Sequence, residues 1–199
     1  DCSFHAHGNG TIGHMVSTYA IRLYAWSAYA FCDDSLQSTM NGYFDVDSRF
    51  EWLDKIIRPK LLELKTLQEK ISYTEQVLLK RLSDVRENTV VNDTIQNILI
   101  NKGSLDIAKL AKESFVSTRQ LERLFHEYVG ITPKKLSNLI RYQFLWRDIL
   151  CEPDFDVLSA VYKFGYTDQS HLLREFKRYH SMDIHNAKIM AFKDVGNIQ

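Results

Sequence analysis

The sequence has little of what marks several large classes of protein. Its 199 residues include only 8 glycines and 3 prolines, which excludes a collagen-like or low-complexity chain. No apolar run approaches the roughly 20 residues that a membrane-spanning helix needs, and no basic stretch leads into an apolar segment near the first residue, so no secretory signal is predicted. The cysteines Cys2, Cys32 and Cys151 are odd in number and far apart, which favours reduced thiols over a disulfide framework. We therefore expect a cytoplasmic protein.

The chain does have enough apolar residues for a sizeable core, and its charge is unevenly distributed. Hydrophobic residues make up 45% of the sequence, which is sufficient for one large domain or two small ones. Residues 1–93 carry 10 basic and 13 acidic side chains, whereas residues 94–199 carry 15 basic and 12 acidic ones. A polyanion would therefore bind the C-terminal half, although a net charge of +3 does not settle the function.

Residues 1–32 differ in character from the rest of the chain. Residues 15–24 are rich in β-branched and aromatic side chains, which predicts one strand or two, and residues 7–10 have the composition of a turn. Because one or two strands do not form a stable sheet alone, we interpret residues 1–32 as the C-terminal remnant of a larger β domain. The alternative is that these strands pair with a second copy of the chain.

Residues 33–90 have a helical pattern. Ser48 and Glu51 form a predicted capping box, and apolar residues follow at helical spacing until Pro59 interrupts them. A long apolar stripe then covers residues 61–82, with a predicted division at residues 72–74. Two interpretations stay open for this segment. It is a packed helical hairpin, or it is a dimerisation surface between two copies.

The polar stretch at residues 84–93 is the predicted linker, and residues 91–199 form the next domain. Helix signals recur there at short intervals and predict seven helices, the fourth running from Pro133 to about Cys151 and the last covering about residues 184–192. The predicted caps are Asp93, Ser104, Ser117, Thr132, Asp156 and Asp168. Gly103, Gly130 and Gly165 are the predicted helix ends.

Two stretches of this domain repeat each other. Residues 121–128 (LERLFHEY) align with residues 172–179 (LLREFKRY) at an offset of 51, so that Arg, Phe and Tyr recur at matching positions. Each copy follows a short helix and a tight turn, which is the pattern of a DNA-reading helix-turn-helix. The connecting helix of about 19 residues would be roughly 28 Å long, which suits two recognition helices in major-groove segments about 34 Å apart.

The same residues carry a resemblance to a known family. Residues 95–188 resemble the DNA-binding domain of AraC/XylS bacterial transcription regulators, above all in the string FGYTDQSHL at residues 164–172 and REFKR at residues 174–178. Gly130 to Pro133 and Arg141 match as well, whereas Ser181 and Ile184 stand where the family usually has Gly and Pro. The resemblance implies a mostly α fold with two helix-turn-helix subdomains on a long linker helix, preceded by a helical segment and the remnant of a barrel-like β sensor domain.

The positions of residues in the two matched helices identify candidate DNA contacts. Arg donates two hydrogen bonds to guanine and Gln pairs with adenine in the major groove. The candidate base-reading residues are Thr118, Arg119, Gln120, Arg123, Gln169, Ser170, His171 and Arg174. The candidate phosphate contacts are Thr132, Lys134, Lys135, Lys177 and Arg178. The alternatives are a salt bridge to a neighbouring carboxylate for Arg123 and Arg174, and a solvated helix face for the lysines.

No catalytic or metal site is predicted. Cys2, His5, His7 and His14 are close in sequence and could hold a metal ion on a strand, but an isolated HxH pair is more often incidental. The scattered cysteines do not fit alkyl-transfer chemistry, and no nucleophile has a paired base. We expect no enzyme activity and no cofactor.

The sequence as a whole predicts a sequence-specific transcription regulator that binds double-stranded DNA. By family resemblance it would bind a small-molecule effector, form a homodimer, contact RNA polymerase and act more commonly as an activator. Five aromatic residues could line an effector pocket or simply pack in a core: Tyr19, Tyr24, Trp26, Tyr29 and Phe31. The alternative function is a helical protein–protein interaction module that does not read DNA.

Overall fold

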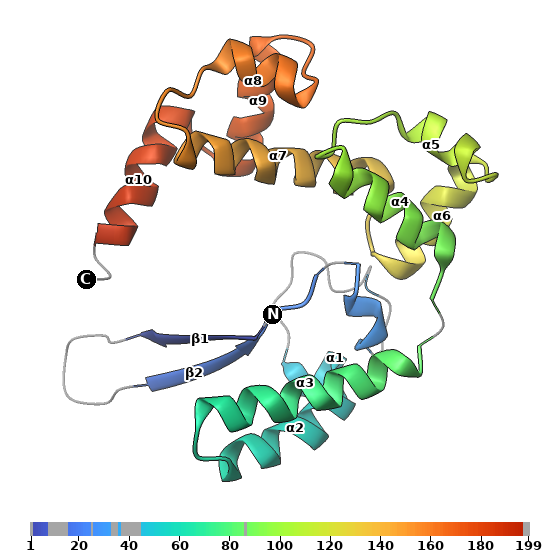
Figure 1. Ribbon diagram of the computed structural model, residues 1–199, viewed down its shortest axis with the longest axis vertical. Helices are drawn as coiled ribbons and strands as arrows, with labels where there is room; N and C mark the ends of the chain where they lie inside the picture. The colour runs from blue at the N-terminus through green and yellow to red at the C-terminus, as the bar shows by residue number, and fades with distance from the viewer. Residues whose placement is uncertain are drawn as a thin grey trace. The chain divides into compact units, whose positions relative to one another are not determined.

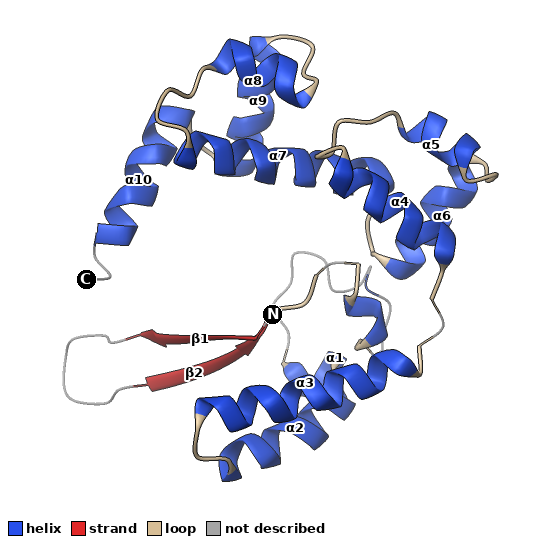
Figure 2. Cartoon of the chain, viewed as in Figure 1, coloured by secondary structure: helices blue, strands red, loops and turns tan. Residues whose placement is uncertain are grey.

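A computed structural model describes residues 2–7, 16–24, 26–32, 36, 45–85 and 87–196. The described chain is mostly helical, with one short strand pair near its beginning (Figure 1; Figure 2). It divides into two compact units, one formed by Asp1–Asn88 with Arg123–Ile131 and the other by Thr89–Glu122 with Thr132–Gln199. Within the described residues, no helix combines the length and the apolar character that crossing a bilayer requires.

The first unit contains a β-hairpin that is attached to a helix. Strands β1 (Cys2–His7) and β2 (Val16–Ile21) pair antiparallel, with Cys2 opposite Ile21. The predicted strand region at residues 15–24 contains β2, but β1 lies upstream of it. The Tyr19 hydroxyl on β2 donates to Thr74 Oγ1 at 3.0 Å and therefore ties the hairpin to the helical segment.

Three helices follow: α1 (Val46–Arg49), α2 (Glu51–Glu63) and α3 (Leu67–Ser83). The predicted capping box at Ser48 is wrong, because Ser48 lies inside α1 and its hydroxyl donates to the Asp45 carbonyl at 2.8 Å. Pro59 does not end the helix either, since α2 continues past it for one turn. Pro59 is exposed on the helix surface, so its ring meets solvent rather than a packed neighbour, and the helix loses one backbone hydrogen bond there.

The division of the apolar stripe also differs from the prediction. Helices α2 and α3 are separated at residues 64–66, where Thr66 and Glu69 form a reciprocal capping box. The predicted division at residues 72–74 lies in the middle of α3. Thr74 is tolerated there although it is buried, because its hydroxyl oxygen has the Tyr19 hydroxyl as a partner.

A short 3-10 turn, η1 (Ala28–Ala30), lies against the helical hairpin. The Trp52 indole donates to the Phe31 carbonyl at 2.7 Å, and the Arg81 guanidinium donates to the Ala30 carbonyl at 3.2 Å. Phe31 is almost fully buried, so this aromatic segment belongs to the core of the first unit. In the same unit Tyr29 meets Tyr128 edge to face, with ring centroids 5.0 Å apart.

Residues 89–196 are all described and contain seven helices, the number that the sequence predicts. They are α4 (Thr89–Ile100), α5 (Ile107–Glu113), α6 (Thr118–Tyr128), α7 (Pro133–Cys151), α8 (Val157–Phe164), α9 (Gln169–His180) and α10 (Ile184–Gly196). The second unit contains all of them except residues 123–128 of α6, which group with the first unit.

Two of the predicted caps in this region are wrong. Helix α4 begins at Thr89, so Asp93 lies inside it, and the buried Val91 shows that the polar stretch before Asp93 is not all linker. Helix α5 is capped by Asp106 rather than by Ser104. The Asp106 carboxylate accepts from the amides of Ala108 and Lys109, at 2.8 and 3.4 Å, whereas Ser104 lies in the preceding turn.

The remaining helix ends agree with the sequence, except that α10 continues to Gly196 instead of ending at about residue 192. Thr132 caps α7 with Pro133 at its first position, and α7 is 19 residues long. Asp156 caps α8, Gly165 ends it in the left-handed conformation at φ 65°, and Asp168 caps α9. Around the second half of α7 these helices enclose one apolar core. Its buried members are Leu145, Ile149, Ala160, Val161, Phe164, Tyr166, Leu172, Phe176 and Ala187.

Candidate nucleic-acid interface

Helices α8 and α9 form a tight helix-turn-helix. After Gly165 the Tyr166 amide donates to the Val161 carbonyl at 3.0 Å, which closes the end of α8. The Asp168 carboxylate accepts from the His171 amide at 2.7 Å and starts α9. The turn is therefore only Gly165 to Asp168, the length that places a second helix across the first.

Helix α9 has an apolar face and a polar face. Leu172 and Phe176 are buried on one side, with exposed fractions of 0% and 1%. Gln169, Ser170 and Arg174 are exposed on the other. Arg174 has no ion-pair partner among the described residues, so the salt bridge considered from the sequence does not form with any of them. The first two turns of α9 thus present amide, hydroxyl and guanidinium donors to solvent.

Unlike its exposed neighbours on α9, His171 contacts other residues of the turn. Its Nδ1 accepts a long hydrogen bond from the Thr167 amide at 3.4 Å, and its ring meets Tyr166 edge to face at 5.3 Å. The imidazole is half-buried. His171 therefore supports the turn through Nδ1, and Nε2 is the ring nitrogen left to meet a ligand.

The first helix-turn-helix is built by α5 and the beginning of α6. The Ser117 hydroxyl accepts from the Gln120 amide at 3.1 Å and caps α6, as predicted. Leu121 is completely buried, whereas Thr118, Arg119 and Gln120 are exposed. The first turn of α6 therefore has the same division into buried and exposed sides as the first turn of α9.

Arg123 lies further along α6 and is exposed. Its Nη1 is 3.6 Å from Glu127 Oε2, and both side chains are more than half exposed. The salt bridge considered from the sequence is therefore present. An exposed pair of this kind contributes only about 0–1 kcal/mol, so the guanidinium remains available to a stronger anionic partner.

The candidate phosphate contacts lie at helix ends. At the beginning of α7 the Thr132 hydroxyl accepts from the Lys135 amide at 3.2 Å, and Lys134 and Lys135 are exposed beside the positive end of the helix dipole. At the end of α9 Lys177 and Arg178 are exposed. Arg178 is partly committed, because its guanidinium donates to the Tyr179 hydroxyl at 3.2 Å.

A buried charge cluster behind α9 was not predicted from the sequence. The Arg141 guanidinium on α7 donates from Nη2 to both carboxylate oxygens of Glu175, at 2.9 Å each. The Tyr166 hydroxyl donates to the same carboxylate at 2.9 Å, and burial next to that carboxylate raises the pKa of Tyr166. The signal in the sequence is Glu175 itself, an acidic residue one turn from Leu172 on the apolar face of α9.

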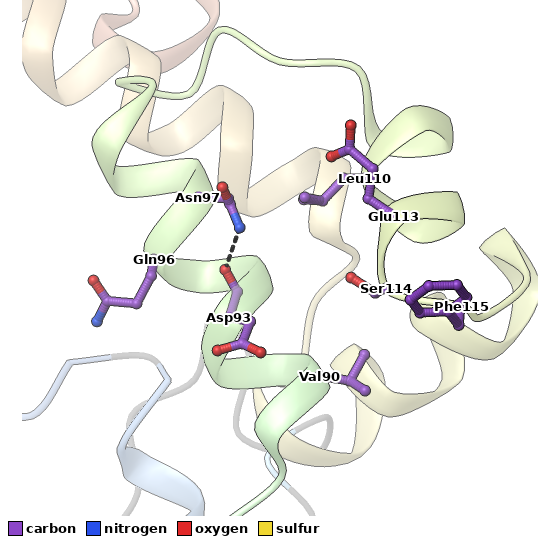
Figure 3. Close-up of a pocket in the computed structure, with 8 residues that line it drawn as sticks. All are labelled: Val90, Asp93, Gln96, Asn97, Leu110, Glu113, Ser114 and Phe115. Atoms are coloured by element: carbon purple, nitrogen blue, oxygen red, sulfur yellow. Dashed lines mark hydrogen bonds between the residues drawn. The ribbon is translucent and has the colours of Figure 1, made fainter.

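A different surface lies between α4 and α5, where eight residues surround an open hollow of about 460 Å³ (Figure 3). Asp93 and Glu113 contribute carboxylates, and the eight described residues that line the hollow include no lysine or arginine. Phe115 lies at its rim with 97% of its surface exposed. Two carboxylates without a cation disfavour phosphate, so this hollow is not part of the candidate DNA surface.

Within the described residues, no group of three or more His, Cys, Asp and Glu side chains is arranged to hold a metal ion. The hypothesis based on Cys2, His5, His7 and His14 lies outside the described side chains.

Two short helix pairs, each with a capped and partly exposed second helix, define a helix-turn-helix protein. Comparison with known proteins agrees, since residues 110–186 match the helix-turn-helix domain family. This part of the chain is a helix-turn-helix domain of the AraC type, as the resemblance implied.

An uncharacterised HTH-type transcriptional regulator of Haemophilus influenzae is 26% identical over 108 residues, which cover 54% of this chain and 35% of that protein. The chain thus spans about a third of the length of this relative. A solved structure of a transcriptional regulator from Chromobacterium violaceum, described by its AraC-type DNA-binding domain, is 19% identical with a TM-score of 0.45, over 51% of this chain and 90% of that one.

Proposed function

We propose that the protein is a sequence-specific transcription regulator that reads two successive major-groove segments of duplex DNA with α6 and α9. The observation that carries this proposal is the repeat: Arg123 and Arg174, at matching positions of the second helix of each unit, are both exposed, whereas the matching Phe125 and Phe176 are buried. Helix α7, with 19 residues, is roughly 28 Å long. That length is comparable with the separation of about 34 Å between successive major-groove segments on one DNA face.

In this proposal Arg119 and Arg123 read bases in one segment, and Gln169, Ser170 and Arg174 read bases in the other. Thr118, Gln120 and the His171 Nε2 add polar contacts at the edges of the two sites. Lys134, Lys135, Lys177 and Arg178, together with the helix start at Thr132, hold the phosphates and fix the position of the protein on the duplex. The exposure of these side chains, apart from the partly buried Thr132 and His171, supports the assignment.

The preceding part of the chain is assigned a regulatory role. Residues 1–32 would be the remnant of a β sensor domain, residues 33–90 a dimerisation segment, and residues 91–199 the DNA-binding domain. Leu62 and Leu79 on the hairpin of α2 and α3 are 83% and 66% exposed, and in this proposal they lie in the homodimer interface, where their apolar surface would be buried. The stacked rings of Tyr24 and Trp26, 4.8 Å apart, support a site for a small effector. Contact with RNA polymerase and activation of transcription follow from the family resemblance.

The test is selection of genomic fragments with the purified chain, followed by the same selection with Arg123→Ala and with Arg174→Ala. Each variant should lose sequence preference in one of two half-sites about one helical turn apart. Arg147→Ala is the matched control, because Arg147 is an exposed arginine of α7 outside the proposed contacts. Unaltered preference in both variants would refute the residue assignment.

Salt dependence separates DNA binding from the alternative of a protein–protein module. Contacts with several phosphates predict that affinity falls by orders of magnitude between about 50 and 200 mM salt. A purified chain that captures no DNA fragment, or whose binding is indifferent to salt, would contradict the proposal.

A further inference from the structure

Arg141 lies in the middle of α7, where the helix is contacted both by the turn leading into α5 and by the second helix-turn-helix. On one side of α7 the turn between α4 and α5 touches the helix backbone: a Cβ atom added to Gly103 would lie 2.1 Å from the Ser137 carbonyl oxygen and 2.6 Å from the Arg141 amide nitrogen. The Ser137 hydroxyl donates to the Gly103 carbonyl at 2.7 Å in a buried position. The segment that leads into α5, the first helix of the first helix-turn-helix, is therefore packed directly on α7 next to Arg141.

The guanidinium group of Arg141 contacts the second helix-turn-helix. Its guanidinium binds both oxygens of Glu175 on α9 and lies over the ring of Tyr166, 4.2 Å from the ring centroid. Tyr166 belongs to the turn between α8 and α9. The Arg141 side chain thus contacts both the turn and the recognition helix α9 of the second helix-turn-helix.

The two turns also touch each other. A Cβ atom added to Gly165, in the turn between α8 and α9, would lie 2.2 Å from the hydroxyl oxygen of Ser104, in the turn between α4 and α5. All of these residues belong to the same compact unit of the structure. We call this cluster the junction: Gly103, Ser104, Ser137, Arg141, Gly165, Tyr166 and Glu175.

The ion pair at the junction is suited to fixing orientation. The side chains of Arg141 and Glu175 are only 8% and 6% exposed, and a buried ion pair is often no more stabilising than a well-packed apolar pair of similar volume. What the bidentate geometry adds is direction, because a planar guanidinium and a planar carboxylate join in one arrangement. An apolar pair has no such directional contact.

We propose that Arg141 and Glu175 are positioning residues that fix the separation and angle between the two DNA-reading units, so that the protein discriminates between half-site spacings. This inference rests on the proposed function. A rigid joint presents two recognition helices at one separation and one rotation. One base pair added between the half-sites displaces the second by about 3.4 Å and rotates it about the duplex, so a rigid protein loses contacts that a loose one recovers.

The experiment uses the full chain and duplexes built on the selected sequence, with one base pair inserted or removed between the half-sites. The wild-type protein should lose about tenfold in affinity on either change, because displaced base contacts are lost. The double variant Arg141→Met with Glu175→Leu keeps the volume without the ion pair, and it should lose less than about threefold while binding an isolated half-site as the wild type does. Arg147→Leu, on the same helix, is the control and should keep the wild-type spacing profile.

Each outcome decides a separate question. Absence of salt-dependent DNA binding by the wild type would refute the proposed function. Wild-type binding that is equal at all three spacings would overturn the positioning inference alone, whether or not the variants fold. A double variant that is folded by circular dichroism and keeps the wild-type spacing profile would overturn it as well, whereas a broadened profile with unchanged half-site binding would support it.

Discussion

The two helix-turn-helix units share one sequence repeat and one pattern of burial. Arg123 and Arg174 occupy matching positions and are exposed, and Phe125 and Phe176 occupy matching positions and are buried. Both recognition helices therefore have the same buried apolar side. The two helices differ in the charged residues on their exposed sides.

Four residues after the matched arginine, α6 has Glu127 and α9 has Arg178. Arg123 is consequently paired with a carboxylate on its own helix, whereas Arg174 has another cation one turn away. Within α9 the carboxylate of Glu175 is buried and bound to Arg141. The second unit thus offers DNA a more positive surface than the first, and we expect it to provide more of the phosphate binding.

The largest expected effect is on the free energy of unfolding, which should fall far more when the buried carboxylate of Glu175 is removed than when the exposed carboxylate of Glu127 is removed. Glu175→Leu leaves the Arg141 guanidinium buried without its partner, which should lower the free energy of unfolding by about 3–5 kcal/mol. Glu127→Leu, in α6, removes only an exposed pair and should change the free energy of unfolding by no more than about 0.5 kcal/mol. Urea unfolding followed by circular dichroism measures both. Equal effects would contradict the comparison.

The next effect concerns the two matched arginines. Arg174→Ala should weaken binding to the selected duplex by about 1–3 kcal/mol, and Arg123→Ala should weaken it less, because Glu127 competes with DNA for Arg123. Glu127→Gln should raise affinity and bring the cost of Arg123→Ala up to that of Arg174→Ala. Fluorescence anisotropy at one fixed salt concentration measures these differences. If Arg123→Ala weakens DNA binding by the same amount with and without Glu127→Gln, then Glu127 does not compete with DNA for Arg123.

A smaller effect is expected on the salt dependence of binding. Lys177→Gln on α9 should reduce the slope of log affinity against log salt by about 1 and should weaken binding to all sequences alike. Lys112→Gln on α5 is the control, since Lys112 is exposed but outside the proposed contacts. If both variants have the wild-type slope, Lys177 does not contact phosphate.

The smallest effect concerns pH and the end of α9. Burial lowers the pKa of His180, and its Nδ1 is hydrogen-bonded to the Tyr142 hydroxyl. The unfolded chain therefore binds a proton that the folded one resists, so stability should fall as pH drops below about 6.5, the ordinary pKa of histidine. His180→Val introduces the residue found at the matching position of the first repeat, Val129. Thermal unfolding between about pH 7.5 and 5 should show a shallower decline for the variant, and parallel declines would contradict the assignment.

Local signals account for most of what the sequence predicted correctly. The starts of α7, α8 and α9 depend on Thr132, Asp156 and Asp168, whose side chains bind amides at most three residues away. Such contacts form within one turn of helix and need no distant partner. For the same reason the 19-residue length of α7 could be predicted from the local sequence signals at its start and its end.

Two of the wrong predictions concern helix caps that the local sequence pattern does not identify by itself. Ser48 and Thr66 both precede a glutamate by three residues, but only Thr66 forms the capping box. Ser104 and Asp106 are both suitable caps, and the structure uses Asp106. The same residue types thus occur at positions that cap a helix and at positions that do not, so the local pattern alone does not locate the cap.

By itself the sequence determined the seven helices of residues 89–196, the repeat within them and the exposed side chains of α9, because helical periodicity and capping act over a few residues. Only the tertiary structure decided which charges are buried. The spacing of Glu175 from Leu172 places it on the apolar side of α9, but its partner Arg141 is 34 residues away along the chain and is known only from the fold. A carboxylate can be buried only where a partner arrives from elsewhere in the fold.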